Sequence, residues 1–266
     1  MQKNIKQIED LLQTKQTEDP KGELLLINYH FENIGFSVGE VERIINGINA
    51  GIPVPHILGY NIICGAKIKI NKDTLNPGPE TKTLTEKVIE YSKKLETPYI
   101  LDLCTGSGAI GISIAMNIHN SICIGTDISM KAINIARENA YANNVRIDFK
   151  LGDLFEPLNG IKFDVIIANP PYVCSNEIDN LPSFVKDFAP KIAIDGGQDG
   201  LLLHRRILKD ANMYLKPKGV LFLECEDNQD SELNKLFKRY YWHINNEYIN
   251  RFGKIRGFQL SFCGNL

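Results

Sequence analysis

The spacing of apolar residues divides the chain near residue 80. Upstream, three apolar stripes recur at the period of an amphipathic helix, at Ile5–Leu12, Leu24–Phe31 and Val38–Ile48. Ser37 and Glu40 have the spacing of a capping box at the start of the third stripe. This part of the chain is expected to form a small helical domain without a catalytic constellation of its own.

A connector rich in proline and glycine follows over Gly51–Gly59. Between Ala66 and Ile70, apolar residues alternate with lysines, which is the period of a half-buried strand. A β-hairpin over about residues 60–75 is therefore expected to join the helical part to the rest of the chain.

Downstream, short apolar runs alternate with segments of helical period. The runs predict strands at Tyr99–Leu103, Ser121–Asp127, Arg146–Leu151, Phe163–Asn169 and Gly219–Cys225. The periodic segments predict helices at Thr81–Leu95, Gly108–Ile118, Ser129–Ala142, Leu201–Leu215 and Asp230–Tyr240. This alternation is typical of an α/β fold with a parallel, doubly wound sheet. Two further strands, near 242–248 and 256–263, lack a helix between them and should form an antiparallel edge hairpin.

Composition narrows the class of protein. The 266 residues are 43% hydrophobic and carry a net charge of −2, so nothing global favours direct nucleic-acid binding. The six cysteines are scattered, without a Cys-x-x-Cys pair or histidines at metal spacing, and neither a disulfide framework nor a metal site is expected. The amino-terminal residues lack the apolar stretch of a signal peptide, and a soluble, cytoplasmic protein is expected.

The first candidate site is a glycine-containing turn between a strand and a helix. Its residues are Asp102, Cys104, Thr105, Gly106, Ser107 and Gly108. Together with Gly111 they also satisfy the bare dinucleotide pattern Gly-x-Gly-x-x-Gly, so the glycines alone do not decide the ligand. Asp102 favours S-adenosylmethionine, because an acid there can receive the ammonium group of a methionine moiety and would be poorly placed beside a pyrophosphate.

Two further strand ends carry acids. Asp127 ends the second strand, where a carboxylate can accept hydrogen bonds from both ribose hydroxyls; as a helix N-cap it is a weaker candidate than Ser129. Asp153 follows the third strand and is placed to approach an adenine amine, with Leu154 packing on the base. Acids at three successive strand ends predict a nucleoside pocket.

The most specific string is Asn169, Pro170, Pro171 and Tyr172, directly after the fourth strand. Two prolines remove two backbone donors, which leaves the Asn169 side-chain oxygen and the Pro170 carbonyl as acceptors. These acceptors can grip both hydrogens of a planar NH2 group, and Tyr172 can stack on that group. The string therefore predicts methyl transfer to an amide or amino nitrogen, with catalysis mostly by positioning.

With these motifs the chain resembles the HemK/PrmC family of protein-glutamine methyltransferases, which modify the Gly-Gly-Gln glutamine of peptide-chain release factors. The resemblance runs over nearly the whole chain and includes Pro77–Thr81, Gly196–Gly200 and Arg256. It implies a Rossmann-like class I methyltransferase domain with a seven-stranded, mostly parallel sheet. It also implies that Cys104 to Gly108, Asp127, Leu154 and Asn169 contact the cofactor, and that Asn169 to Tyr172 contact the glutamine.

The expected domains are a substrate-docking helical domain over 1–58, a connector and hairpin over 59–76, and the methyltransferase domain over 77–266. Three positions depart from the family pattern: Gly78 replaces an arginine, Lys82 a glutamate and Ala189 a glutamate. None of the three belongs to the two candidate sites.

Two other functions remain open at this stage. The Asn-Pro-Pro-Tyr string also serves adenine and guanine exocyclic amines, which would require a flipped or single-stranded base. A binding module that keeps the fold but has lost activity is the other alternative, motivated by Gly78 and Ala189 and opposed by the intact cofactor motifs.

Overall fold

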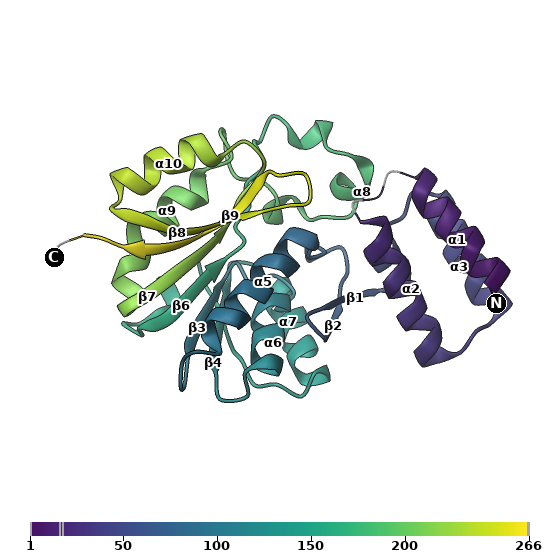
Figure 1. The fold of residues 1–266 in the computed structure, drawn as a ribbon, viewed down its shortest axis with the longest axis horizontal. Helices are drawn as coiled ribbons and strands as arrows, with labels where there is room; N and C mark the ends of the chain where they lie inside the picture. The colour runs from purple at the N-terminus through teal and green to yellow at the C-terminus, as the bar shows by residue number, and fades with distance from the viewer. Residues whose placement is uncertain (1, 16, 18, 265–266) are drawn as a thin grey trace.

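The chain folds into a group of helices, a two-stranded hairpin and a seven-stranded sheet covered by helices (Figure 1). The structure is a computed structural model, and it describes residues 2–15, 17 and 19–264. Within these residues, no helix combines the length and the apolar character that crossing a bilayer requires.

Four helices make up the amino-terminal part. They are α1 (Gln2–Thr14), α2 (Pro20–Ile34), α3 (Val38–Asn49) and α4 (Val54–Leu58). Their apolar faces share one core, around Ile8, Ile27 and Ile44. Helix α4 lies inside the proline- and glycine-rich connector, and its prolines fit because a first helical turn needs no backbone donor there.

The predicted capping box at the start of α3 is half right. The Ser37 hydroxyl accepts a hydrogen bond from the Glu40 backbone amide at 3.2 Å. The Glu40 carboxylate does not return to Ser37 and instead contacts Arg43 and His30. Arg43 is the main reason that the Glu40 pKa falls to about 2. The other ring nitrogen of His30 contacts the hydroxyl of Tyr60 at 3.0 Å, which ties these helices to the first residue of the hairpin.

The hairpin consists of β1 (Tyr60–Ile63) and β2 (Ala66–Lys69), paired antiparallel. Its apolar side packs on helices α6 and α7 of the main sheet. Asn139 of α7 and Asn143, the C-cap residue just after α7, bind the backbone of β2 in the manner of a neighbouring strand. Asn139 accepts from the Lys69 amide at 2.8 Å and donates to its carbonyl at 3.0 Å, and Asn143 does the same for Lys67.

The main sheet has the strand order β5-β4-β3-β6-β7-β9-β8. Its strands are β3 (Tyr99–Leu103), β4 (Ile122–Asp127), β5 (Asp148–Leu151), β6 (Phe163–Ala168), β7 (Leu215–Glu224), β8 (Trp242–Ile249) and β9 (Ile255–Phe262). Strands β3 to β7 are parallel, and β9 runs antiparallel to both β7 and β8. The predicted α/β class, the mostly parallel seven-stranded sheet and its antiparallel edge are confirmed.

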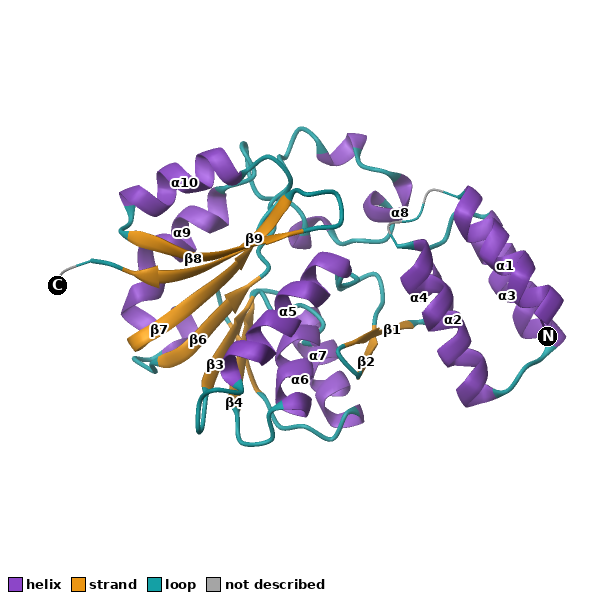
Figure 2. Cartoon of the chain, in the orientation of Figure 1, coloured by secondary structure: helices purple, strands orange, loops and turns teal. Residues whose placement is uncertain are grey.

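Helices cover both faces of this sheet (Figure 2). The helices of the sheet region are α5 (Pro79–Ser92), α6 (Ala109–Asn117), α7 (Met130–Ala142), α8 (Ser183–Lys186), α9 (Leu202–Asp210) and α10 (Asp230–Arg239). One face packs on α5 and α6 around Val165 and Phe222, and the other packs on α9 and α10 around Leu221 and Leu223. Strands with both faces buried explain why their sequences are continuous apolar runs.

A few boundaries differ from the sequence prediction. The helix expected over Leu201–Leu215 ends at Asp210 and continues as a 3-10 turn over Ala211–Tyr214. Strand β7 begins at Leu215, four residues earlier than expected, because that residue pairs with Phe163 across a register shift.

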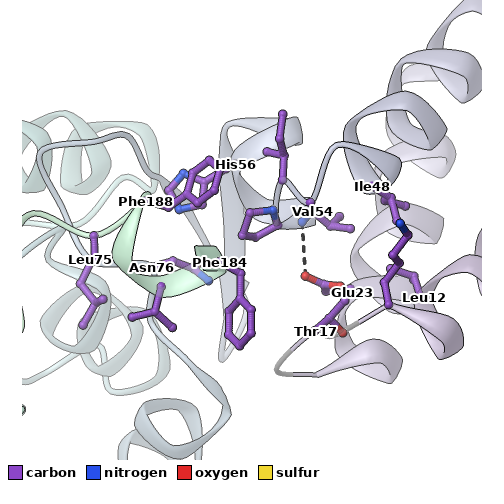
Figure 3. A pocket seen from close by; sticks show the side chains of 16 residues that line it. Leu12, Thr17, Glu23, Ile48, Val54, His56, Leu75, Asn76, Phe184 and Phe188 are labelled. Atoms are coloured by element: carbon purple, nitrogen blue, oxygen red, sulfur yellow. Dashed lines mark hydrogen bonds between the residues drawn. The ribbon is translucent and has the colours of Figure 1, made fainter. Parts of the chain in front are cut away.

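A crevice lies between the amino-terminal helices and the segment around α8 (Figure 3). The rings of His56 and Phe188, both in its lining, contact each other with centroids 4.9 Å apart and ring planes tilted by 44°. On the helical side, the Val54 amide donates to the Glu23 carboxylate at 3.2 Å, which holds α4 against α2. Burial lowers the pKa of His56.

Candidate active site

The two candidate motifs meet where the strand order reverses. Strands β3, β4 and β5 progress to one side of the sheet, and β6 returns to the other side of β3. Leu103 of β3 is paired with Ala168 of β6, so Cys104 and Asn169 leave neighbouring strand ends. Open parallel sheets bind ligands at such a switch point, at the carboxyl ends of the strands.

A cavity opens at this point, and most of the predicted site residues line it. The lining residues that were predicted are Cys104, Thr105, Gly106, Ser107, Asp127, Asp153, Leu154, Asn169 and Pro171. The predicted residues outside its lining are Asp102, Gly108, Pro170 and Tyr172. The cavity therefore joins the glycine turn, two of the acidic strand ends, and Asn169 and Pro171 of the Asn-Pro-Pro-Tyr string.

The backbone around the cavity is locally strained. Cys104 has φ of 57° and Leu154 has φ of 50°, both in the left-handed region that side chains other than glycine rarely adopt. Such residues cluster at ligand sites, where the surrounding structure holds them in place. Gly108 has φ of 79°, and a Cβ there would approach Ala136 and Phe149 to 3.1 Å, so glycine is required for close packing of helix α6.

Asp127 ties two loops of the cavity together. Its Oδ2 accepts from the Gly106 amide at 2.9 Å, and its Oδ1 accepts from the Ser129 amide at 2.8 Å. Burial raises its pKa, and these amides oppose that shift. Ser129 is the N-cap of α7, because its hydroxyl accepts from the Ala132 amide. Asp127 is thus left as a cavity-lining carboxylate with its orientation fixed.

Asp102 supports the glycine turn from beneath. It is 1% exposed, and its Oδ2 accepts from the Thr105 hydroxyl at 2.6 Å and from the Gly111 amide at 3.0 Å. Its Oδ1 is buried without a hydrogen-bond partner among the described residues. Burial raises the pKa of Asp102 to about 7. The predicted contact with a ligand ammonium group stays a prediction, and the loop-supporting role is added to it.

Asp153 is engaged by a residue that the sequence did not single out. Arg206, on α9, places Nη2 2.9 Å from Asp153 Oδ2, and both side chains line the cavity. The ion pair holds the Gly152–Leu154 turn against α9. Leu154 is buried beside it.

Asn169 is oriented by two buried side chains. Its Nδ2 donates to Thr81 Oγ1 at 3.0 Å, and the Thr81 hydroxyl donates to Glu224 Oε1 at 3.2 Å. Thr81 lies in the first turn of α5, and Glu224 ends β7. Because Nδ2 is committed to Thr81, the Asn169 Oδ1 is the amide atom left to accept from a ligand.

Tyr172 faces Arg256. Its hydroxyl accepts from Arg256 Nη2 at 3.2 Å, and the guanidinium lies 5.6 Å from its ring centroid. Its backbone is enclosed by the glycine segment: a Cβ on Gly196 would come within 2.7 Å of the Tyr172 Cα. Gln229 donates to the Tyr172 carbonyl at 3.0 Å. The Gly196–Gly200 string therefore shapes the wall behind Tyr172.

Several site residues were missed by sequence reasoning. Thr81, Arg206, Ile128, Pro190 and Ile192 line the cavity, and Glu224 reaches it through Thr81. Asn139 was also missed, although its amide donates to the Ser107 carbonyl at 2.9 Å while holding the hairpin. Thr81 carried a signal, since Pro77–Thr81 was noted as part of the family resemblance.

The family model described as "Methyltransferase small domain" matches residues 81–196 of this chain. The chain resembles the solved structure of a ribosomal protein L11 methylase from Lactobacillus delbrueckii subsp. bulgaricus, with 18% sequence identity and a TM-score of 0.53 over 71% of this chain and 81% of that one. It also resembles a methyltransferase from Pyrococcus furiosus, with 20% sequence identity and a TM-score of 0.53 over 76% of this chain and 90% of that one. At these identities the likeness concerns the fold.

Several curated relatives are more similar to this chain in sequence than these two solved structures are. A release factor glutamine methyltransferase from Thermodesulfovibrio yellowstonii is 40% identical over 66% of this chain. The match spans 64% of that relative's length, slightly under two thirds. One from Clostridium acetobutylicum is 34% identical over 80% of this chain and 76% of its own length, and one from Bacillus cereus is 33% identical over 75% and 72%.

The sheet topology and the cavity at its switch point are those of an S-adenosylmethionine-dependent methyltransferase. Within that class, the relatives narrow the assignment. The chain belongs to the family of release factor glutamine methyltransferases.

Proposed function

We propose that this protein transfers the methyl group of S-adenosylmethionine to the side-chain amide nitrogen of the glutamine in the Gly-Gly-Gln motif of peptide-chain release factors. The observation that carries the proposal is that one cavity is lined by both Asn169 and the Cys104–Ser107 turn. A nitrogen held at Asn169 therefore lies beside the cofactor motif. The reaction would take place in the cytoplasm, where translation termination occurs.

The cavity suits the cofactor's parts. Asp127 offers carboxylate oxygens for ribose hydroxyls, Asp153 and Leu154 offer an acceptor and an apolar surface for adenine, and the Cys104–Ser107 turn offers backbone groups. The buried Asp102 Oδ1 lacks a partner among the described residues and is an acceptor that a cationic ammonium group would satisfy. When bound, S-adenosylmethionine supplies an electrophilic methyl group and leaves as S-adenosylhomocysteine; the chemistry involves no metal.

The substrate amide is held by acceptors. Asn169 Oδ1 and the Pro170 carbonyl each accept one hydrogen of the glutamine NH2, while Pro171 lines the cavity and Tyr172 contacts the flat amide face. This grip orients the nitrogen toward the cofactor turn and concentrates electron density on it. The contribution is positional, so no strong general base is required.

The helical part over 1–58 is proposed to dock the release factor, and 77–266 to carry the reaction. Leu25 and Tyr29 lie one turn apart on α2 and are exposed, Leu25 to 69%. They line a groove together with Gly78 and Lys82, two of the positions that depart from the family pattern. These two exposed apolar side chains are available for contact with an apolar surface of the release factor.

The decisive experiment offers purified enzyme and labelled S-adenosylmethionine to four acceptors in parallel. These are a release factor, its Gly-Gly-Gln glutamine-to-alanine variant, bulk RNA and bulk DNA. We expect label only on the intact release factor. Label on nucleic acid alone would establish the alternative amine methyltransferase. Absence of both methyl transfer and calorimetric cofactor binding would establish an inactive binding module.

A further inference from the structure

Asn169 is one end of a chain of hydrogen bonds that runs through Thr81 to Glu224, and the bond to Glu224 sets which groups donate along it. Glu224 and Thr81 are 2% and 4% exposed, so water does not compete for their bonds. The chain runs from Asn169 Nδ2 to Thr81 Oγ1 over 3.0 Å, and from the Thr81 hydroxyl to Glu224 Oε1 over 3.2 Å. Three segments remote in sequence thus converge on one amide.

The order of donors and acceptors follows from the chemistry of each group. A hydroxyl has a single proton to give, and an amide nitrogen can only donate. Glu224 Oε1 accepts the hydroxyl proton of Thr81 at 3.2 Å. Thr81 therefore gives its proton to Glu224 and keeps only lone pairs for Asn169. Asn169 must turn its NH2 group to Thr81, which leaves Oδ1 on the other side of the amide.

We propose that Thr81 and Glu224 are positioning residues for methyl transfer, which select the amide orientation of Asn169 that presents oxygen to the substrate. The inference rests on the proposed function, in which that oxygen accepts from a glutamine NH2. If the Asn169 amide were rotated by half a turn, its NH2 group would face the NH2 group of the substrate glutamine, and two donors would oppose each other. Neither positioning residue needs to touch the reacting atoms.

The first test is steady-state methylation of a release factor by the full-length enzyme. Thr81→Val removes the hydroxyl at nearly constant volume, and we expect turnover to fall about tenfold or more, toward the scale of losing a preorganised active-site contact. Thr81→Ser retains the hydroxyl and should restore most of that turnover. Cofactor affinity, measured by calorimetry, should not change in either variant.

Thr85→Val is the matched control. Thr85 is fully buried one turn along the same helix, and its hydroxyl donates to the Thr81 carbonyl at 2.7 Å. It should lower the thermal midpoint without lowering turnover. Equal turnover losses in Thr81→Val and Thr85→Val would show a merely structural role and overturn the proposal, as would wild-type turnover in Thr81→Val.

A double-mutant cycle tests whether Thr81 acts through Asn169. Once Asn169→Ala has removed the amide, adding Thr81→Val should cause no further loss of turnover. Losses that multiply would overturn the proposal. Glu224→Gln gives a second approach. A glutamine side chain can donate to Thr81 Oγ1, which frees the Thr81 hydroxyl proton to bind Asn169 Oδ1. Turnover should then fall without a change in cofactor affinity.

A readout independent of activity separates this proposal from the proposed function. In the 15N-labelled protein, the side-chain NH2 signals of Asn169 are identified by their loss in Asn169→Ala. They should keep their shifts and slow solvent exchange in Thr81→Ser and lose both in Thr81→Val. Unchanged signals in Thr81→Val would overturn the orienting role. If the wild-type enzyme fails to methylate release factors, the proposed function is wrong. The Asn169 NH2 signals would then still test whether Thr81 orients the amide.

Discussion

The Asp127 carboxylate and the Gly106 amide are joined by a 2.9 Å hydrogen bond, although Asp127 ends β4 and Gly106 follows β3. The bond fixes the glycine turn against the loop after β4 and leaves Asp127 lining the cavity. One carboxylate thereby shapes the cavity and offers itself to a ligand. Removing it should affect cofactor binding more than any other step.

We expect Asp127→Ala to weaken S-adenosylmethionine binding by about 1–3 kcal/mol, the scale for leaving polar partners unpaired. The measurement is calorimetric titration of the purified protein. Asp148→Ala is a suitable control, because Asp148 is an exposed carboxylate at the start of β5, away from the cavity lining. An unchanged dissociation constant in Asp127→Ala would show that the ribose assignment is wrong.

We expect Asn169→Ala to lower turnover by at least about a hundredfold, since it removes a preorganised acceptor at the reacting nitrogen. Cofactor affinity should change far less, because the Gly106 turn keeps its own contacts. Asn169→Asp keeps an acceptor but adds a negative charge near a sulfonium, and should also be slow. Near-normal turnover of Asn169→Ala on a glutamine substrate would remove the Asn-Pro-Pro-Tyr string from the proposed site.

Arg256 should matter because it orients Tyr172. Arg256→Ala removes both the hydrogen bond to the tyrosine hydroxyl and the cation above its ring. We expect a loss of about tenfold in kcat/KM for the release factor, equivalent to about 1.4 kcal/mol. Arg239→Ala serves as the comparison, because Arg239 covers the ring of Tyr240 outside the cavity lining. Equal effects of the two variants would contradict a specific role for Arg256.

Asp102 should give stability a distinctive pH dependence. Its pKa rises from 3.8 to about 7 in the folded protein because burial disfavours the charged form. The folded state therefore binds the proton more tightly, and this stabilisation is full below about pH 4 and is lost as the pH rises through 7.

The measurement is the free energy of unfolding of wild type minus that of Asp102→Asn, taken without cofactor. Between pH 5 and pH 8 this difference should fall by about 1–3 kcal/mol. His204, whose pKa burial lowers to about 4, acts in the opposite direction but is present in both proteins, so it cancels. A difference that stays constant across this range would show that Asp102 titrates normally.

Docking of the release factor by the helical part can be tested without truncation. Leu25→Ser changes a highly exposed residue and should leave folding and cofactor binding intact. We expect KM for the whole release factor to rise several-fold, on the order of 1 kcal/mol of lost apolar contact, while a short Gly-Gly-Gln peptide is unaffected. Tyr141→Ser, on α7 and 88% exposed, is the control. Unchanged KM in Leu25→Ser would exclude this face.

The regular elements were predictable because their periods reflect burial. Strand β3 was predicted residue for residue, since a strand buried on both faces must be a continuous apolar run. Segments without a period were not predictable. Helix α8 and the 3-10 turns on either side of it were missed, and no separate helix was predicted at α4, because its stretch reads as a connector rich in proline and glycine.

The sequence by itself determined which chemical groups gather at the carboxyl edge of the parallel strands. Parallel strands direct their carboxyl ends to one edge, so the chain order of Gly106, Asp127, Leu154 and Asn169 was enough to bring them to one cavity. The tertiary structure alone decided what each group contacts. Thr81 meets Asn169 across 88 positions and Glu224 across 143, and Arg206 meets Asp153 across 53. A hydrogen bond depends on approach within about 3 Å, and no local pattern encodes that distance between remote segments.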